Sequence, residues 1–272
     1  MRSRHSTYQK NEFKRNSSWN ARPQWSQLAE PLWTDPGVKR GLIRVRALIS
    51  TQKSTGGEWF VEPSPKILAC EEIAATISNE SFYSFKQVLN VSHNHATYLK
   101  LGLRFQLLTQ LTILDLSHNP FTNASQDAFE MAETWDHLVP RSLDLSFCQL
   151  QAFHPQALPA VPGLKNLSLA GNRLLSFAQV VEVLLQLETS GLEVVDLSNM
   201  SVSDPGLFSE VRLMALKELD LSGNLIGNVP AASFGNIRSL RKLDISGNLL
   251  TTLDAGFEDL VNLVELNISH CM

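Results

Sequence analysis

From about residue 85 onward, apolar and polar residues alternate in short bursts that recur along the chain. The burst LKELDLSGNLI at 216–226 returns as LRKLDISGNLL at 240–250. Alternate side chains of a strand point to opposite sides, so Leu219 and Leu221 are predicted to point inward and the residues between and after them outward. One short strand cannot bury its leucines alone. The pattern therefore predicts strands stacked about 4.8 Å apart in a parallel sheet.

Eight segments of this kind align with one another. The steps between equivalent positions are 25, 29, 24, 28, 24, 24 and 23 residues. The position that follows the strand holds asparagine in most units, and Met200 or a cysteine in the others. This regularity indicates a repeat architecture in which each unit contacts only its neighbours.

The shared pattern, L-x-x-L-x-L-x-x-N/C-x-L, resembles the leucine-rich repeat family. The resemblance implies an α/β fold, a right-handed solenoid or horseshoe with a parallel concave sheet and a convex side of loops and short helices. It also implies an internal ladder, whose side chains hydrogen-bond the backbone of the neighbouring turn. The ladder positions are Asn94, Asn119, Cys148, Asn172, Asn224, Asn248 and Cys271.

The convex side is predicted to vary between units. In the regular units, Phe234 and Phe257 are expected to fill the convex core. The longer unit at 177–192 has apolar residues with i, i+3, i+4, i+7 spacing, which predicts one apolar helix face packed against the solenoid. These residues are Val180, Val183, Leu184 and Leu187.

Charge divides the chain into two parts. Residues 1–66 carry 12 Lys and Arg against 5 Asp and Glu, whereas residues 67–272 carry 11 against 22. Four of the five tryptophans also lie in the first part. We predict an atypical basic N-terminal segment over 1–66, poorly ordered, and a solenoid of seven to eight units over 67–272. The last unit stops at Met272 and the cysteine-rich caps of extracellular members are missing, so we expect a C-terminally truncated fragment.

Glycosylation sequons and missing targeting signals favour different cellular compartments for this chain. The chain has no 18-residue apolar run and no secretory signal peptide, so a membrane is expected only through segments absent from this chain. Repeat type and sequons favour an extracellular or cell-surface location, and a cytoplasmic location is the alternative. The expected glycosylation sites are Asn79, Asn90, Asn123, Asn166, Asn199 and Asn267.

No pattern in the sequence indicates catalysis or a cofactor. Nucleophile elbow, Walker loop, HExxH and CxxC are all missing, so an enzyme is not expected. His93 and His118 occupy equivalent positions, but SHN is ordinary repeat wording and no metal site is predicted. The basic start lacks a nucleic-acid-binding module, so no nucleic acid is expected as a partner. Cys148 and Cys271 lie five units apart, too far for a disulfide.

Outward strand positions form predicted columns on the concave face. One column is mainly acidic and favours a cationic partner. A basic column beside it, Arg141, Lys165, Lys217 and Arg241, is expected to offset the acids by pairing along the sheet. Variable outward positions complete the candidate contact surface. The predicted ligand-binding residues are Ile113, Asp115, Asp144, Phe147, Val194, Asp196, Glu218, Asp220, Lys242, Asp244 and Glu265.

These patterns predict a non-catalytic module that recognises a protein ligand or co-receptor, with a homodimer as a further possibility. The repeat type and irregular units resemble Toll-like receptor and related surface-receptor ectodomains. The alternative is an intracellular scaffold or regulatory subunit, which fits the missing signal peptide and caps. Association with an enzyme domain beyond Met272 is a third hypothesis.

Overall fold

The structure is a computed structural model, and it describes most of the repeat region. The described residues are 51–53, 58–61, 88–101, 111–129, 140–161, 163–252 and 255–271.

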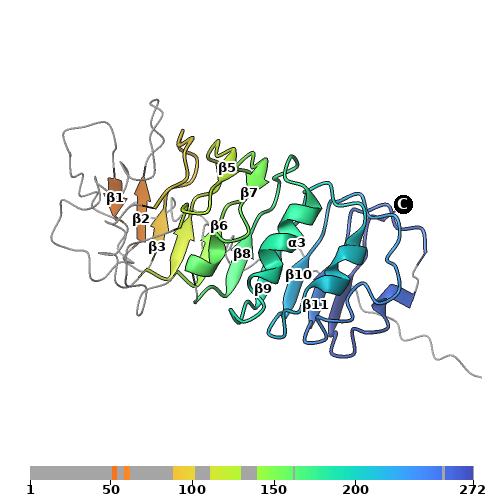
Figure 1. The fold of residues 1–272 in the computed structure, drawn as a ribbon. Coiled ribbons are helices and arrows are strands. Elements are labelled where there is room, and N and C mark those ends of the chain that lie inside the picture. The colour runs from red at the N-terminus through yellow and green to blue at the C-terminus, as the bar shows by residue number, and fades with distance from the viewer. Residues whose placement is uncertain are drawn as a thin grey trace, which may run out of the picture. The chain divides into compact units, whose positions relative to one another are not determined.

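One sheet runs through this part of the chain, with its strands side by side in chain order (Figure 1). Its eight repeat strands are parallel and in register, so that each apolar central residue lies beside its equivalent in the next unit. The repeat strands are β3 (Val88–Asn90), β4 (Ile113–Asp115), β6 (Ser142–Asp144), β8 (Asn166–Ser168), β9 (Val194–Asp196), β10 (Glu218–Asp220), β11 (Lys242–Asp244) and β12 (Glu265–Asn267).

The sheet extends N-terminal of the boundary predicted at residue 67. Strand β2 (Glu58–Val61) pairs in parallel with β3, and β1 (Thr51–Lys53) pairs antiparallel with β2. Neither strand carries the repeat sequence pattern, so the alternation of apolar and polar residues did not predict them. The other residues of the predicted N-terminal segment lie outside the described residues.

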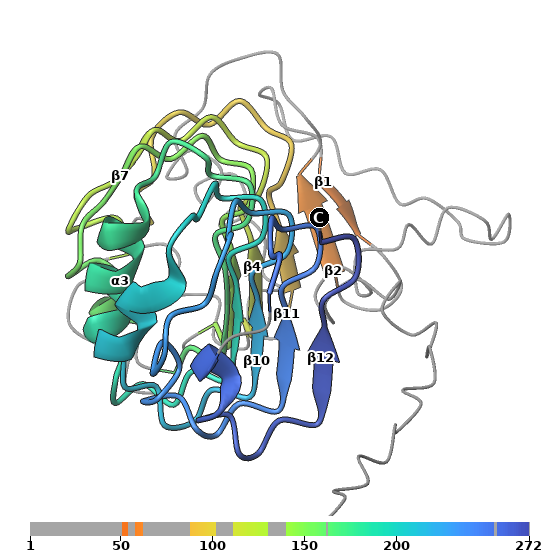
Figure 2. The same cartoon turned by 90° about the vertical axis from the view of Figure 1, so that its right-hand side faces the viewer.

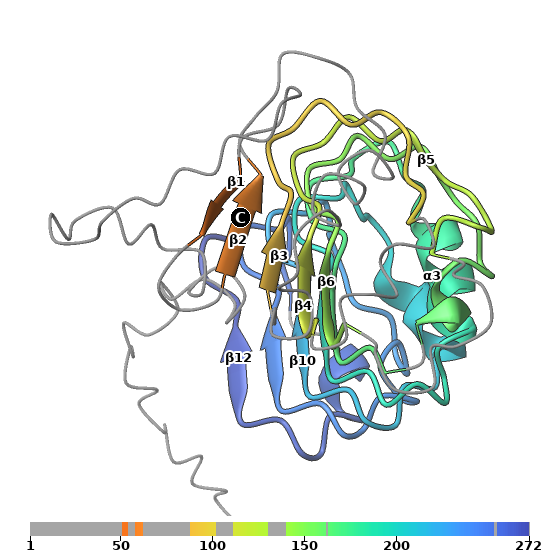
Figure 3. The same cartoon turned by 90° about the vertical axis from the view of Figure 1, so that its left-hand side faces the viewer.

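The connections between strands form the opposite wall of the solenoid (Figures 2 and 3). They contain the short helices that were predicted for the convex side, and also two short strands that were not predicted. They are β5 (Asn123–Ala124), β7 (Ala152–Phe153), α3 (Phe177–Leu185) and the short 3₁₀ helices Leu158–Ala160, Pro205–Glu210 and Ala255–Phe257.

Helix α3 forms in the longer unit for the reason the spacing predicted. The Ser176 hydroxyl caps its start by accepting from the Gln179 N–H at 3.3 Å. Its apolar face turns into the solenoid, so the prediction of packing against the core is confirmed. Val180, Val183, Leu184 and Leu187 are all buried.

The core lies between the sheet and the connecting wall. Leu219 and Leu221 are buried, as the alternation predicted. On the wall side, the ring of Phe234 lies 6.0 Å from that of Phe208 and 6.3 Å from that of Phe257. Phe234 is fully buried and Phe257 packs partly buried against the core, so both residues fill the convex core as expected. Each unit therefore covers an apolar surface of the previous one.

Candidate recognition surface

Asparagine side chains join successive turns into a ladder. The Asn172 carbonyl oxygen accepts from the N–H groups of Cys148 and Leu150, both at 3.0 Å, in the preceding unit. Its amide donates to Leu145 O at 2.9 Å and to Leu169 O at 2.8 Å. One buried side chain thus satisfies four backbone groups that lie away from water, which holds the turns beside the sheet at a fixed spacing.

The same role recurs at the other ladder positions. Asn119, Asn224 and Asn248 each bridge their own turn and the preceding one. Asn94 donates to carbonyls of its own unit. Two cysteines stand in for the amide and donate weakly to the preceding unit, through Cys148 Sγ to Leu116 O and Cys271 Sγ to Ile245 O. The two cysteines form no disulfide with each other, as their separation predicted.

The third residue of each repeat strand forms what we call the carboxylate row. Each of its aspartates caps the turn that follows. Asp144 Oδ1 accepts from the Ser146 N–H at 2.8 Å, and Asp220 Oδ1 accepts from the Ser222 N–H at the same distance. The recurring Asp-x-Ser wording is therefore explained by local turn geometry. The row comprises Asn90, Asp115, Asp144, Ser168, Asp196, Asp220, Asp244 and Asn267.

Burial and crowding disfavour charge in this row. Burial and the nearby Asp115 carboxylate raise the pKa of Asp144 to about 7. Burial and Asp196 raise the pKa of Asp220 to about 7 in the same way. Burial also raises the pKa of Asp115 and of Asp196. Within the described residues, no lysine or arginine forms an ion pair with the row. The row therefore has no lysine or arginine partner in this part of the solenoid, although the nearby His118 and His93 lower the pKa of Asp115.

The predicted basic column pairs elsewhere. Lys165 and Lys217 both pair with Glu193, which lies between them in the row just before the strands. The expectation that these lysines offset the aspartates is wrong. Residues at equivalent positions of adjacent strands are directly opposed, whereas the carboxylate row lies three residues, about 10 Å, further along each strand.

The first residue of each repeat strand forms a second outward row, whose charge changes along the sheet. In the later units, Lys242 lies between Glu218 and Glu265, at 3.8 and 3.7 Å. In the earlier units the equivalent residues are uncharged, with the half-buried Ile113 and Val194 among them. The structure thus aligns the predicted variable contact positions along one face. Its last three positions are charged and paired, and the five before them are neutral.

Three rings stack beside the carboxylate row. The His93 and His118 rings lie 4.0 Å apart at 11°, and those of His118 and Phe147 lie 4.9 Å apart at 10°. We call these three residues the ring stack. The sequence pattern places the two histidines at equivalent positions, but the prediction did not extend the series to Phe147. The signal that could have found it is the alignment of all three at the turn position that is glycine in several other units.

The predicted contact residues differ in how much of them a partner can reach. Phe147 is 46% exposed, whereas Asp196 is only 3% exposed. The other predicted contact residues are half-buried. These are Ile113, Asp115, Asp144, Val194, Glu218, Asp220, Lys242, Asp244 and Glu265. Contact of any of them with a ligand stays a prediction.

The sequons also differ in their surroundings. Asn123 lies exposed on β5, in the two-stranded sheet that β5 forms with β7 apart from the main sheet. The amides of Asn90 and Asn267 donate to Asp115 and Asp244 of the neighbouring units, both at 2.8 Å. Asn166 and Asn199 are half-buried, and Asn79 lies outside the described residues.

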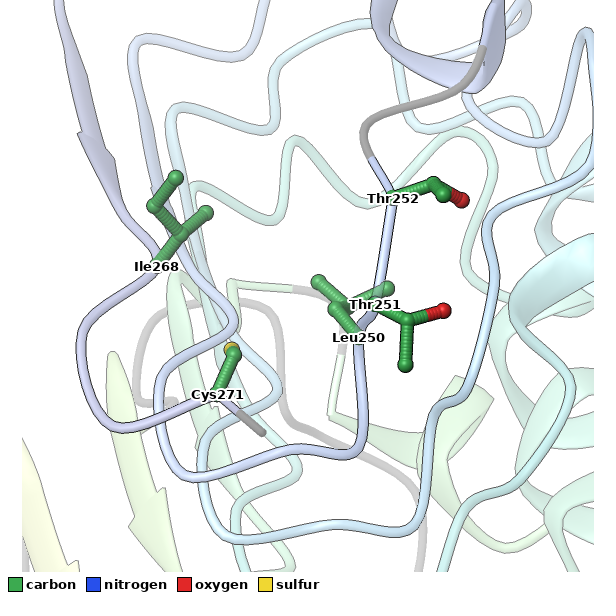
Figure 4. Close-up of a pocket in the computed structure, with 5 residues that line it drawn as sticks. All are labelled: Leu250, Thr251, Thr252, Ile268 and Cys271. Atoms are coloured by element: carbon green, nitrogen blue, oxygen red, sulfur yellow. The ribbon is translucent and has the colours of Figure 1, made fainter.

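A shallow hollow lies beside β12 (Figure 4). Ile268 and Cys271 come from the turn after β12, and Leu250, Thr251 and Thr252 come from the facing segment. These residues offer neither an acid–base pair nor a charged anchor for a small molecule. The hollow therefore does not compete with the sheet face as a candidate site.

The described residues contain no group of three or more His, Cys, Asp or Glu side chains arranged to hold a metal ion. Among the helices of the same residues, none has the length and apolar character needed to cross a membrane.

Stacked strand-and-turn units joined by an internal asparagine ladder define a leucine-rich repeat solenoid. Two stretches match models described as leucine-rich repeat, at residues 110–131 and 215–272. These findings confirm that the chain carries leucine-rich repeats, as its sequence pattern predicted. No curated protein matches the chain.

Among solved structures, the crystal structure of human 5T4 (Wnt-activated inhibitory factor 1, trophoblast glycoprotein) is similar to this chain. The identity is 24%, the match covers 68% of this chain and 70% of that one, and the TM-score is 0.55. At this identity the likeness shows the fold alone. The matched leucine-rich repeats support a protein-interaction module, and they leave the compartment open.

Proposed function

We propose that this chain is a non-catalytic recognition module that binds a protein partner through its sheet face, in the ectodomain of a cell-surface or secreted protein. The observation that carries the proposal is the sheet face itself. Eight units align their outward side chains there in continuous rows. A broad, preformed surface of this kind suits recognition of another protein better than catalysis on a small molecule.

Recognition is tested on the neutral half of the face. Chemical cross-linking of the native protein in its own cells, read by mass spectrometry, identifies the bound protein. Val194→Arg then places a long charged side chain on the face, and we expect it to reduce that cross-link at least tenfold. Leu174→Arg is the matched control, because Leu174 is exposed in a turn away from the repeat strands. If both variants reduced the cross-link equally, or if neither reduced it, binding through the sheet face would be contradicted.

The extracellular assignment is supported by Asn123. This sequon does not arise from the repeat wording, and its side chain is exposed on β5. A glycan at Asn123 would leave the sheet face uncovered, because β5 belongs to a separate small sheet. The printed title of the similar human structure also calls that protein a glycoprotein.

The test is a denaturing gel of the native protein before and after peptide-N-glycosidase. We expect a downward shift, with a smaller shift for Asn123→Gln. Ser125→Ala should behave like Asn123→Gln because it destroys the same sequon. Asn228→Gln is the control, because Asn228 is exposed and lies outside any sequon, so the shift should be unchanged. A native protein with no shift at all would refute the extracellular assignment.

One observation favours an intracellular scaffold instead. Neither of the two described cysteines forms a disulfide, and Cys148 is fully buried within the ladder. Cysteines outside disulfides are typical of reducing compartments. Absence of the glycosidase shift would move the proposal to this second location and would leave recognition through the sheet face untouched.

A further inference from the structure

The ring stack is built by the backbone of the solenoid. The His93 N–H donates to Ser117 O at 3.1 Å, and the His118 N–H donates to Ser146 O at 2.9 Å. The Phe147 N–H continues this ladder to Ala170 O at 2.7 Å. Because these bonds set the spacing of successive turns, the three rings are held nearly parallel with their edges at the surface.

The backbone at these positions is strained for the residues that occupy it. His93, His118 and Phe147 have φ values of 56°, 55° and 54°. The equivalent residues of later units include Gly223 and Gly247, which adopt the same left-handed region at no steric cost. A bulky phenylalanine in this region is an outlier, and such strain concentrates at functional sites.

The strain is not explained by burial of Phe147. Its side chain is 46% exposed, in contrast to the fully buried phenylalanines of the core. Stacking on His118 returns part of the energy, but it also fixes the ring. The other face of the ring lies on Gly171, where an added Cβ would come within 2.3 Å of the ring. Phe147 is therefore an exposed aromatic side chain held in one orientation before any partner arrives, which is the property of a preorganised contact residue.

The charge beside the stack indicates the chemistry of the partner. Asp115 lies close enough for the charges of His118 and His93 to lower its pKa, against the larger effect of burial. Asp144 follows in the same row, half-buried, three residues before Phe147. Neither carboxylate has an ion pair with a lysine or arginine of the described residues. An aromatic ring beside carboxylates that no described lysine or arginine pairs with is complementary to a cation carried on an aliphatic stem.

We propose that His93, His118 and Phe147, together with Asp115 and Asp144, form the docking site for an arginine- or lysine-bearing segment of the protein partner. The stem of the basic side chain packs on the exposed ring edges, and its cation lies against the carboxylates. This proposal rests on the proposed recognition function and names where on the solenoid its strongest contact lies.

The test uses a defined probe, a library of random 12-residue peptides selected on the immobilised full-length protein. We expect the selected peptides to be enriched in arginine and lysine. Phe147→Gly should weaken their binding at least tenfold, which corresponds to about 1.4 kcal/mol. The same substitution should leave the thermal midpoint unchanged or raise it, because glycine relieves the left-handed strain.

Two further variants sharpen the result. Leu225→Ala is the matched control, since Leu225 is 50% exposed in a turn outside the stack, and its peptide binding should equal that of the unmodified protein. Asp144→Asn keeps an acceptor for the Ser146 N–H but removes the charge, so it should weaken the basic peptides. Peptides without basic enrichment, or basic peptides that bind Phe147→Gly undiminished, would overturn the proposal. These outcomes do not depend on the glycosidase experiment or on the cross-link lost in Val194→Arg, so each proposal fails separately.

Discussion

Asp144 should make the solenoid more stable in mild acid than in mild base. Its carboxylate is buried in a row with Asp115, which raises its pKa from 3.8 to about 7. The folded protein therefore holds this proton more tightly than the unfolded chain does. Stability from this group is fully present below pH 3.8 and is lost as the pH rises through about 7.

The magnitude follows from the two pKa values. One pKa unit corresponds to about 1.4 kcal/mol, so the raised pKa of Asp144 lowers the free energy of unfolding by roughly 4 kcal/mol at pH 8 and by roughly 2 kcal/mol at pH 5. Asp144→Asn removes the charge and keeps an oxygen that accepts from the Ser146 N–H. The variant should thus be stabilised more at pH 8 than at pH 5, by roughly 2–3 kcal/mol.

Urea unfolding at both pH values measures this difference. The corresponding difference in thermal midpoint is about 5–10 °C. Asp127→Asn is the control. Hydrogen bonding to Lys100 lowers the pKa of exposed Asp127 to about 2, so this carboxylate stays ionised across the window and its removal has no pH-dependent effect. His118 opposes the trend in the unmodified protein. Burial lowers its pKa, so its protonation destabilises the fold in acid and this cost disappears as the pH rises. An equal gain for Asp144→Asn at both pH values would refute the reasoning.

Three other substitutions test the remaining contacts by urea unfolding. Asn172→Ala leaves four buried backbone groups without their side-chain partner and should cost at least about 3 kcal/mol; a loss below about 1 kcal/mol would contradict the ladder's role. Phe234→Ala opens a cavity in the connecting wall and should cost about 3–5 kcal/mol, whereas a loss near that of a surface site would show that the wall collapses into the space. Lys242→Gln breaks two exposed ion pairs and should change stability by less than about 1 kcal/mol, with the difference vanishing in 1 M salt; a larger, salt-independent loss would indicate packing by the lysine stem.

The sequence could predict the structural features that are encoded within each single repeat unit. The alternation that buries Leu219 and Leu221 needs only the preference of apolar side chains for the interior, and it recurs unit after unit. The ladder at Asn172 and the apolar face of α3 also follow from residue type and local spacing. Repetition makes such assignments strong, because each unit tests the same pattern again.

Contacts between units could be predicted less well. Lys165 and Lys217 lie 28 and 24 residues from Glu193 in the sequence. They pair with Glu193 and not with the aspartates because all three occupy equivalent positions in adjacent units. The ring stack depends on left-handed backbone at three turns, which residue type alone argues against for Phe147. Strands β1 and β2 carry no repeat wording and join the sheet only through backbone pairing.

The later and the earlier units of the sheet face should contribute differently to the free energy of binding a partner. In the later units Lys242 is already engaged by Glu218 and Glu265, so a ligand there must strip water from paired charges and gains little in return. In the earlier units the first row is uncharged. It lies beside carboxylates that have no ion pair with a described lysine or arginine, and beside the exposed Phe147 ring. Aromatic anchors carry much of the free energy of binding, while exposed charges chiefly affect association rate and salt dependence. Substitutions at Phe147 should therefore change the dissociation rate of a partner, and substitutions at Lys242 its association rate at low salt.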